Sequence, residues 1–264
     1  MLELPLIFRP EKESNFVRLG RNNDGGYIVP VDAAKDSNLL LSFGLDDDWS
    51  FEKDFYEINH NQIIVCDASV NFNYWIKKFI KNIVNIFRLK ISLSKFAKDL
   101  IIFFKFYSFF LKKEKTHLKK FLVSEKFLMD SIDKNQRITL RELIEKKQSQ
   151  RILVKIDIEG NEYRVLDELI EFQEYFTSLV IEFHNCDLFY EKIEKFVKNF
   201  KLDLVHIHVN NFGDIRKDKF PTVIEMTFSK NIYNKNRKDN FEFPNKKLDQ
   251  PNDPNKKDLE VKFI

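Results

Sequence analysis

The sequence predicts an α/β protein built on a mostly parallel β-sheet. Short runs rich in Ile, Val and Leu end on polar residues, as strands buried on both faces of a parallel sheet do. Segments with apolar residues at helical spacing separate these runs, which indicates βαβ units. The last two strand-like runs are joined by a loop alone, so they predict an antiparallel hairpin that completes the sheet.

The expected strands span residues 38–44, 62–68, 151–160 and 178–185, and those of the hairpin span 202–209 and 222–229. Helices are expected at residues 163–172 and 188–200, where apolar side chains recur at helical spacing. A parallel sheet completed by an antiparallel hairpin is the architecture of the class I methyltransferases, which are Rossmann-like proteins. The Rossmann dehydrogenase fold lacks that hairpin.

Residues 1–264 are expected to form a single domain that carries a basic helical insertion. Residues 72–120 hold 13 Lys or Arg and 2 Asp or Glu, so they carry +11 and the remainder −8 of an overall +3. We expect one or two amphipathic helices there, forming a lid. The lysines could be solvated, attract a phosphorylated acceptor, or contact an anionic membrane surface. Nucleic-acid binding is not expected, because no recognised module accompanies the charge.

Residues 230–264 are rich in Asn, Lys, Asp and Pro and predict a loose C-terminal extension, in which 259–264 could add an edge strand. Cys66 and Cys186 lie near the ends of two strands that should not be neighbours, so a disulfide is not expected. Free thiols fit a reducing compartment. Residues 1–5 have no signal-peptide character. The longest apolar stretch, 100–111, falls short of the ~18 residues of a spanning helix. We therefore expect a cytoplasmic protein.

The run at residues 155–163, K-I-D-I-E-G-N-E-Y, resembles the K-I-D-I-E-G-x-E signature of the FkbM-type S-adenosylmethionine-dependent methyltransferases. Residues 21–27 resemble the D-G-G-Y turn of that family, and S-F-G at 42–44 followed by F-E at 51–52 resembles its first nucleotide-binding loop. H-I-H at 206–208 with N-N at 210–211 resembles a late strand end of the family. The resemblance spans about residues 18–230 and covers the basic insertion poorly.

This resemblance implies a class I fold, S-adenosylmethionine as methyl donor and an O-methyl product. Family members often act on carbohydrates or polyketides, with bacterial surface glycans a frequent setting. The expected substrate is therefore a sugar hydroxyl of a nucleotide-activated or surface-glycan (capsular polysaccharide) precursor. Two alternatives stay open. The first loop, residues 44–49, lacks the usual G-x-G, which leaves room for a non-catalytic binding module. A nicotinamide-dependent oxidoreductase would need G-x-G-x-x-G there.

Four residues are expected to contact the methyl donor. Gly44 and Asp46 belong to the first loop, where an acid would lie near the cationic amino-acid end of the donor. Asp67, at the end of the second strand, is placed to accept the ribose hydroxyls. Asp157 should lie nearest the donor, because its strand adjoins the first one.

The expected catalytic residues are His184, Asp157 and His208. A sugar hydroxyl is a poor nucleophile at neutral pH, so a base helps, and the unperturbed pKa of histidine near 6.5 makes His184 the expected base. His206 and His208 share one face of a strand, and His208 is expected to face the acceptor while the other is structural. Asp157, Glu182 and His184 could also bind a divalent metal, but no spacing is diagnostic and a metal is not predicted.

Overall fold

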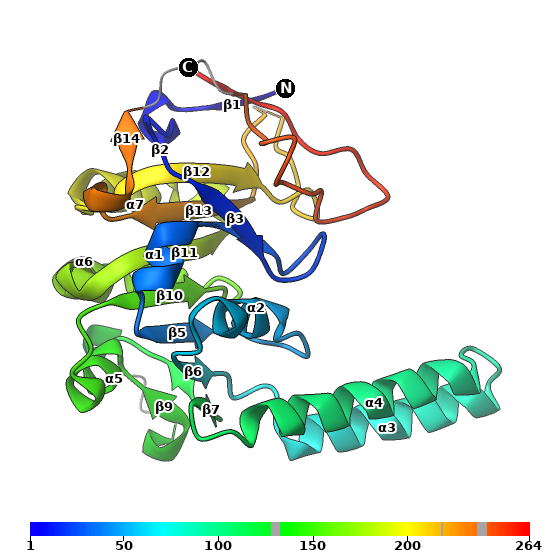
Figure 1. The fold of residues 1–264 in the computed structure, drawn as a ribbon. Coiled ribbons are helices and arrows are strands. Elements are labelled where there is room, and N and C mark those ends of the chain that lie inside the picture. Colours follow the sequence, from blue (N-terminus) through cyan, green and yellow to red (C-terminus); the bar gives the residue numbers. More distant parts are fainter. Residues whose placement is uncertain (128–132, 218, 237–241) are drawn as a thin grey trace.

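The protein is organised around one seven-stranded sheet with helices on both faces, as the computed structural model in Figure 1 shows. The structure describes residues 1–127, 133–217, 219–236 and 242–264. Across the sheet the strands are β12 (Asp203–Val209), β13 (Val223–Ser229), β11 (Phe176–His184), β10 (Ile152–Ile156), β5 (Leu39–Phe43), β6 (Gln62–Cys66) and β7 (Lys115–Leu118).

The strand order confirms the class I methyltransferase fold. Only β13 runs antiparallel to its neighbours, β11 and β12, so the predicted hairpin completes a parallel sheet. The chain order reverses between β5 and β10, because β6 and β7 extend the sheet on one side and β11, β13 and β12 on the other. Open α/β sheets bind ligands at the carboxyl ends of the strands at such a point.

Two helical layers bury the faces of the sheet, which explains why β5 and β10 have no exposed residue. On one face, a hydrophobic core cluster includes side chains from α5 (Leu140–Lys147), α6 (Leu166–Phe172) and α7 (Cys186–Asn199). The other cluster contains α1 (Val31–Asp36), α2 (Ser50–Asn59) and the base of the helices α3 (Phe72–Phe87) and α4 (Leu93–Phe110). The helices expected at 163–172 and 188–200 are confirmed as α6 and α7.

The basic insertion is a two-helix hairpin, α3 and α4, that projects from the domain (Figure 1). Its expected end at residue 120 is wrong, because Lys115–Leu118 form β7 and pair with β6 as an edge strand of the sheet. The sequence K-T-H-L has no buried-strand pattern, since an edge strand keeps one side partly open. Within the described ranges, no helix has both the length and the apolar character needed to cross a membrane.

The C-terminal extension is packed onto the domain, so the expectation of a loose tail is wrong for its described part. Asp249 and Asn252 are buried. The expected strand at 259–264 is present as β15 (Val261–Phe263), but it pairs in parallel with β1 (Leu2–Leu4) and not with the main sheet. The two termini therefore lie side by side (Figure 1). Residues 237–241 of the extension lie outside the described residues.

Short elements complete the fold. Three small strand pairs are β2 (Lys12–Glu13) with β14 (Lys235–Asn236), β3 (Phe16–Leu19) with β4 (Tyr27–Pro30), and β8 (Phe121–Leu122) with β9 (Arg137–Ile138). Single turns of 3-10 helix lie at Leu6–Phe8, Glu125–Phe127, Lys134–Gln136, Glu162–Arg164, Gln173–Tyr175 and Asn231–Tyr233. Both cysteines, Cys66 and Cys186, are buried and free.

Candidate active site

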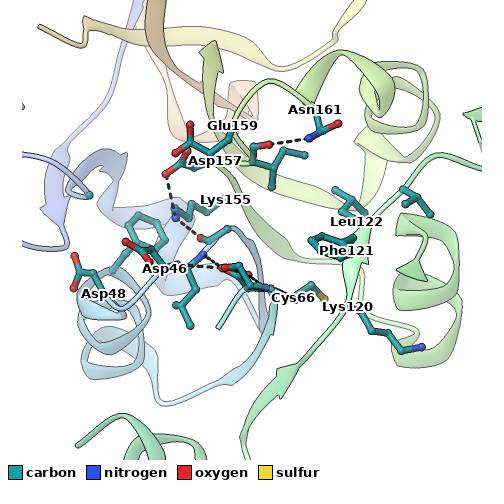
Figure 2. Close-up of a pocket in the computed structure, with 18 of the residues that line it drawn as sticks. Asp46, Asp48, Cys66, Lys120, Phe121, Leu122, Lys155, Asp157, Glu159 and Asn161 are labelled. Atoms are coloured by element: carbon teal, nitrogen blue, oxygen red, sulfur yellow. Dashed lines mark hydrogen bonds and ion pairs between the residues drawn. The ribbon is translucent and has the colours of Figure 1, made fainter. Parts of the chain in front are cut away.

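A cavity of about 610 Å³ opens at the carboxyl ends of β5, β6 and β10. Gly44, Asp67 and Asp157, each from the end of a different strand, all line it, and so does Asp46. Phe121 and Leu122 lie on the opposite side from Asp46 and Asp48 (Figure 2). The remaining lining residues are Arg21, Asp24, Gly25, Leu45, Phe51, Cys66, Ser69, Lys120, Val123, Ser124, Lys155, Ile158, Glu159, Asn161 and Arg164.

Gly44, just after β5, lies in close contact with the backbone of Asp157, just after β10. Its φ is +81°, and a Cβ built on it would lie 1.6 Å from the carbonyl oxygen of Asp157. Lys155 donates from its Nζ to the Gly44 carbonyl at 2.7 Å, so a side chain also ties the two strand ends together. A glycine is therefore required at position 44 for the cavity edge to close.

The first loop keeps its path without a second glycine. Asp46 stands where G-x-G would place that glycine, and it adopts a φ of +48°, which aspartate tolerates better than most residues. The backbone N–H groups of Leu45 and Asp46 donate to Oδ2 of Asp67 at 2.8 and 3.1 Å. The departure from G-x-G is thus compensated by a carboxylate on the neighbouring strand.

Asp67 is a charged support of this loop at the cavity edge. Its Oδ1 accepts hydrogen bonds from the N–H and hydroxyl of Ser69 at 2.7 and 2.6 Å. Burial would raise the pKa of the Asp67 carboxyl, but these bonds and those from the loop outweigh it and lower the pKa. All four lone-pair sites are engaged, so a ribose hydroxyl would share or replace one of these donors. For Asp46, burial and the nearby charges of Asp47 and Asp67 raise the pKa.

A cluster of hydrogen-bonded polar side chains adjoins the cavity at Asp157. The Tyr27 hydroxyl lies 3.0 Å from Oδ2 of Asp157 and 2.8 Å from Oε2 of Glu182, and it donates its single proton to one of them at a time. Asn210 donates to the other oxygen of Glu182 at 2.8 Å. Burial, followed by the charges of Asp157 and Glu225, raises the pKa of Glu182 well above its usual value. Of the two carboxyl groups, that of Asp157 lines the cavity and that of Glu182 does not.

His184 lies in this group, 4.0 Å from Asp157 through Nε2 and 3.1 Å from Glu162 through Nδ1. Burial lowers the pKa of the imidazole, but the hydrogen bond with Glu162 and the charges of Glu182, Glu162 and Asp157 outweigh it and raise the pKa to about 9. A histidine with this pKa is protonated at neutral pH and cannot accept a proton. Its surroundings thus oppose the expected role of His184 as general base.

The late histidines lie away from the cavity. His208 is buried between Glu225 and Asp258, at 3.2 and 3.0 Å, so both ring nitrogens are engaged. His206 is buried against Asp249 at 3.0 Å. The expectation that His208 faces an acceptor is not met, because the C-terminal extension covers this strand end and supplies carboxylate partners.

One set of side chains in the described residues could hold a divalent cation: Asp157, Glu182 and His184 each offer one ligand atom within 4.8 Å of the others. His184 Nε2 lies 4.0 Å from Asp157 and 3.9 Å from Glu182. Ligand atoms around a cation at ~2.1 Å lie roughly 3 Å apart in octahedral geometry. The set is thus too wide for a preformed site, and hydrogen bonds already engage Oδ2 of Asp157 and both oxygens of Glu182.

Sequence reasoning missed Tyr27 and the wall formed by residues 120–124. Tyr27 belongs to the D-G-G-Y run, so the resemblance gave a signal for it, but its place between two carboxylates depends on the tertiary fold. The wall follows the unrecognised strand β7 and has no motif. The hairpin does not line the cavity, so it is no lid in this conformation. It contacts the first loop through the Lys78–Asp47 ion pair and the rings of Trp49 and Phe106.

The fold and cavity define the class of protein: a class I methyltransferase fold with an open pocket at the switch point of the sheet. No protein-family model matches the chain, and no curated protein is significantly similar to it. Among solved structures it is similar to fibrillarin of Methanococcus jannaschii, a pre-rRNA processing protein, with a TM-score of 0.37 and 8% identity over 75% of this chain and 68% of that one.

Two further similar structures are a candidate RNA methyltransferase, PH1948, from Pyrococcus horikoshii and the TYW2 protein of M. jannaschii in complex with S-adenosylmethionine. The first has a TM-score of 0.36 and 10% identity over 76% of this chain and 77% of that one. The second has a TM-score of 0.34 and 10% identity over 75% and 73%. Similarities this low identify neither a substrate nor site residues.

Proposed function

We propose that the chain is an S-adenosylmethionine-dependent methyltransferase that transfers a methyl group to a hydroxyl of a sugar. The observation that supports this most is the meeting of Gly44, Asp67 and Asp157 at one cavity, from three neighbouring strands at the switch point of the sheet. The volume of the cavity, about 610 Å³, lies within the range of roughly 300–1,000 Å³ found for small-molecule sites.

The lining suits the parts of the methyl donor. Phe121 and Leu122 offer an apolar surface for a purine ring. Asp67 and Asp46 present carboxyl groups to the space across from that wall, where ribose hydroxyls and an ammonium group would be favourable. When bound, S-adenosylmethionine supplies a methyl group on a positively charged sulfur. The chain orients the reactants and provides negative charge. Good orientation alone accounts for much of the rate enhancement of an in-line displacement.

Asp157 is the residue we assign to receive the proton of the acceptor hydroxyl. It lines the cavity, and Tyr27 and Lys155 both hold its Oδ2, at 3.0 and 3.9 Å. Its other oxygen, Oδ1, points toward the protonated ring of His184. In this arrangement His184 is a positioning residue that Glu162 orients from behind. With S-adenosylmethionine bound, the acceptor oxygen would bond to the methyl carbon as the carbon–sulfur bond breaks and S-adenosylhomocysteine leaves, and the proton of the hydroxyl would pass to Asp157.

The choice of a sugar rests on the resemblance of residues 155–163 to the FkbM-type family. Glu159 and Asn161, which also line the cavity beside Asp157, are compatible with a sugar substrate. Their carboxyl and amide groups provide hydrogen-bond partners for several hydroxyls. We propose a nucleotide-activated sugar or a surface-glycan precursor as the acceptor.

Methyl-labelled S-adenosylmethionine incubated with nucleotide-linked sugars and unlinked glycan precursors tests the proposal. We expect label in a sugar product, with one equivalent of S-adenosylhomocysteine formed. Asp157→Asn serves as the inactive variant and Glu191→Gln, an exposed acid on α7, as the matched control. Transfer of label to RNA and to no sugar would refute the assignment of a sugar as the acceptor. Binding of NAD without binding of S-adenosylmethionine would refute the methyltransferase.

A further inference from the structure

The helical hairpin, residues 72–111, exposes an unusual amount of apolar surface. Of the twenty large hydrophobic side chains that are exposed in the described residues, eleven lie on it. Phe87 and Leu89 near its tip are 84% and 93% exposed. The hairpin projects from the domain (Figure 1), and none of the other described elements buries these side chains. The set is Phe72, Ile76, Ile80, Ile83, Val84, Phe87, Leu89, Leu93, Ile101, Phe104 and Leu111.

These side chains are not the interface between the two helices. That interface is a separate stripe, in which Trp75 and Phe79 of α3 pack against Phe96, Phe103 and Phe106 of α4. It also buries the Asn82–Asp99 hydrogen bond at 2.7 Å. The packing between the two helices therefore does not use the exposed apolar side chains, and these remain available to a partner.

The exposed side chains form one stripe on each helix. At ~100° per residue, those of α3 fall within an arc of roughly 120°, and Leu93, Ile101 and Phe104 of α4 within roughly 80°. Each stripe is turned from the interhelical face in the same sense, by roughly 110° on α3 and roughly 140° on α4. Because the helices run antiparallel, rotations in the same sense place both stripes on the same broad side of the hairpin. The result is one continuous apolar side about 27 Å long, the length of the 18-residue α4.

Basic side chains accompany the apolar side. Residues 72–111 contain eight Lys or Arg and a single acid, Asp99, for a net charge of +7. Asp99 is buried between the helices, so it presents little negative charge outward. Lys77 and Lys81 of α3 and Lys98 and Lys105 of α4 follow their apolar stripes on the next sector of each helix.

We propose that the hairpin docks in the plane of an anionic lipid surface, with the apolar stripes in the acyl boundary and the lysines at the headgroups. An amphipathic helix with an apolar face and flanking lysines is suited to this partner, since long lysine stems reach back to the headgroups. A second copy of the chain is less suited, because it would bring two +7 surfaces together. Nucleic acid would engage the lysines but would leave Ile and Val stripes exposed.

The proposed docking surface belongs to an element that is attached to the cavity loop. Lys78 at the base of α3 pairs with Asp47, and Trp49 packs on Phe106, so the hairpin is attached to the loop that lines the cavity. The docking surface does not depend on the proposed methyl transfer, because lipid binding can be measured without substrate.

Sedimentation of the full chain with vesicles tests the proposal. We expect binding to phosphatidylcholine vesicles that contain phosphatidylglycerol, at least tenfold weaker binding to phosphatidylcholine alone, and release by high salt. Ile80→Ser with Phe104→Ser should weaken binding by at least tenfold, and Lys77→Gln with Lys81→Gln by about tenfold. Leu188→Ser with Ile232→Ser, which alters two side chains elsewhere that are at least as exposed, should leave binding unchanged.

Three other outcomes would each overturn the proposal. Absence of sedimentation at low salt with a folded chain removes the lipid surface as partner. A dimer in light scattering that Ile80→Ser with Phe104→Ser dissociates, without vesicle binding, assigns the surface to a second copy. Salt-sensitive binding of an RNA oligonucleotide, without vesicle binding, assigns it to nucleic acid. Circular dichroism of each variant verifies that the hairpin is still helical.

Discussion

Replacement of Gly44 by alanine tests the close approach on which the cavity edge depends. Two costs add in Gly44→Ala. A non-glycine residue at a φ of +81° costs about 1–2 kcal/mol. The new Cβ would also lie 1.6 Å from the Asp157 carbonyl oxygen, so β5 and β10 must separate, and forced repacking of this kind costs about 1–3 kcal/mol more. We expect a loss of about 2–5 kcal/mol in the free energy of unfolding, measured by urea denaturation.

Gly160→Ala is the matched control. Gly160 also has a positive φ, +95°, but the nearest atom to its added Cβ is the Nδ2 of Asn185 at 3.3 Å. It should therefore show only the backbone cost of about 1–2 kcal/mol, and it should keep its affinity for S-adenosylhomocysteine. Equal destabilisation by the two substitutions would refute the close approach at Gly44.

Three further predictions address the chemistry and the polar groups. Asp157→Asn should lower kcat by about 10²–10⁴-fold, the usual effect of a lost proton acceptor, while binding of S-adenosylhomocysteine in calorimetry changes little; near-normal kcat would exclude it as base. Dialysis against EDTA should leave turnover unchanged, because the ligand atoms of Asp157, Glu182 and His184 are spread too widely for a preformed metal site; lost activity that Mg²⁺ or Mn²⁺ restores would contradict this. Glu225 and Asp258 outweigh the effect of burial and raise the pKa of His208 well above 6.5. Its stabilising contribution is then full below pH ~6.5 and declines as the pH rises toward the folded-state pKa. Denaturation across pH should thus show a shallower decline above pH ~6.5 for His208→Gln than for the unaltered chain, and parallel curves would exclude this role.

The central sheet could be predicted from the sequence because its strands are buried on both faces. Runs such as L-L-L-S-F of β5 and I-L-V-K-I of β10 have a hydrophobicity that a loop would not tolerate. Lys115–Leu118 could not be recognised, because an edge strand keeps polar side chains. The packed tail was missed for a similar reason. Its Asp249, Asn252 and Asp258 resemble loop residues, and they form hydrogen bonds with partners on the sheet that the sequence does not reveal.

The candidate site was predictable in position and less so in chemistry. Parallel strands place Gly44, Asp67 and Asp157 at one edge, so their meeting follows from the strand order. The protonation of His184 does not follow, because it depends on Glu162 and on carboxyl groups from other strands. His208 is ambiguous in sequence for the same reason, since its partner Asp258 lies 50 residues away in the chain.

Calorimetric titration with S-adenosylhomocysteine tests the central claim most directly. We expect a single site that NAD does not occupy, and an affinity about tenfold lower in Phe121→Ala, since loss of a stacking surface for a base costs about 1–3 kcal/mol. Leu188→Ala, which removes a more exposed side chain outside the cavity, should bind as the unaltered chain does. A folded protein that takes up NAD, or that gives no heat with S-adenosylhomocysteine, would contradict the assignment of the cavity.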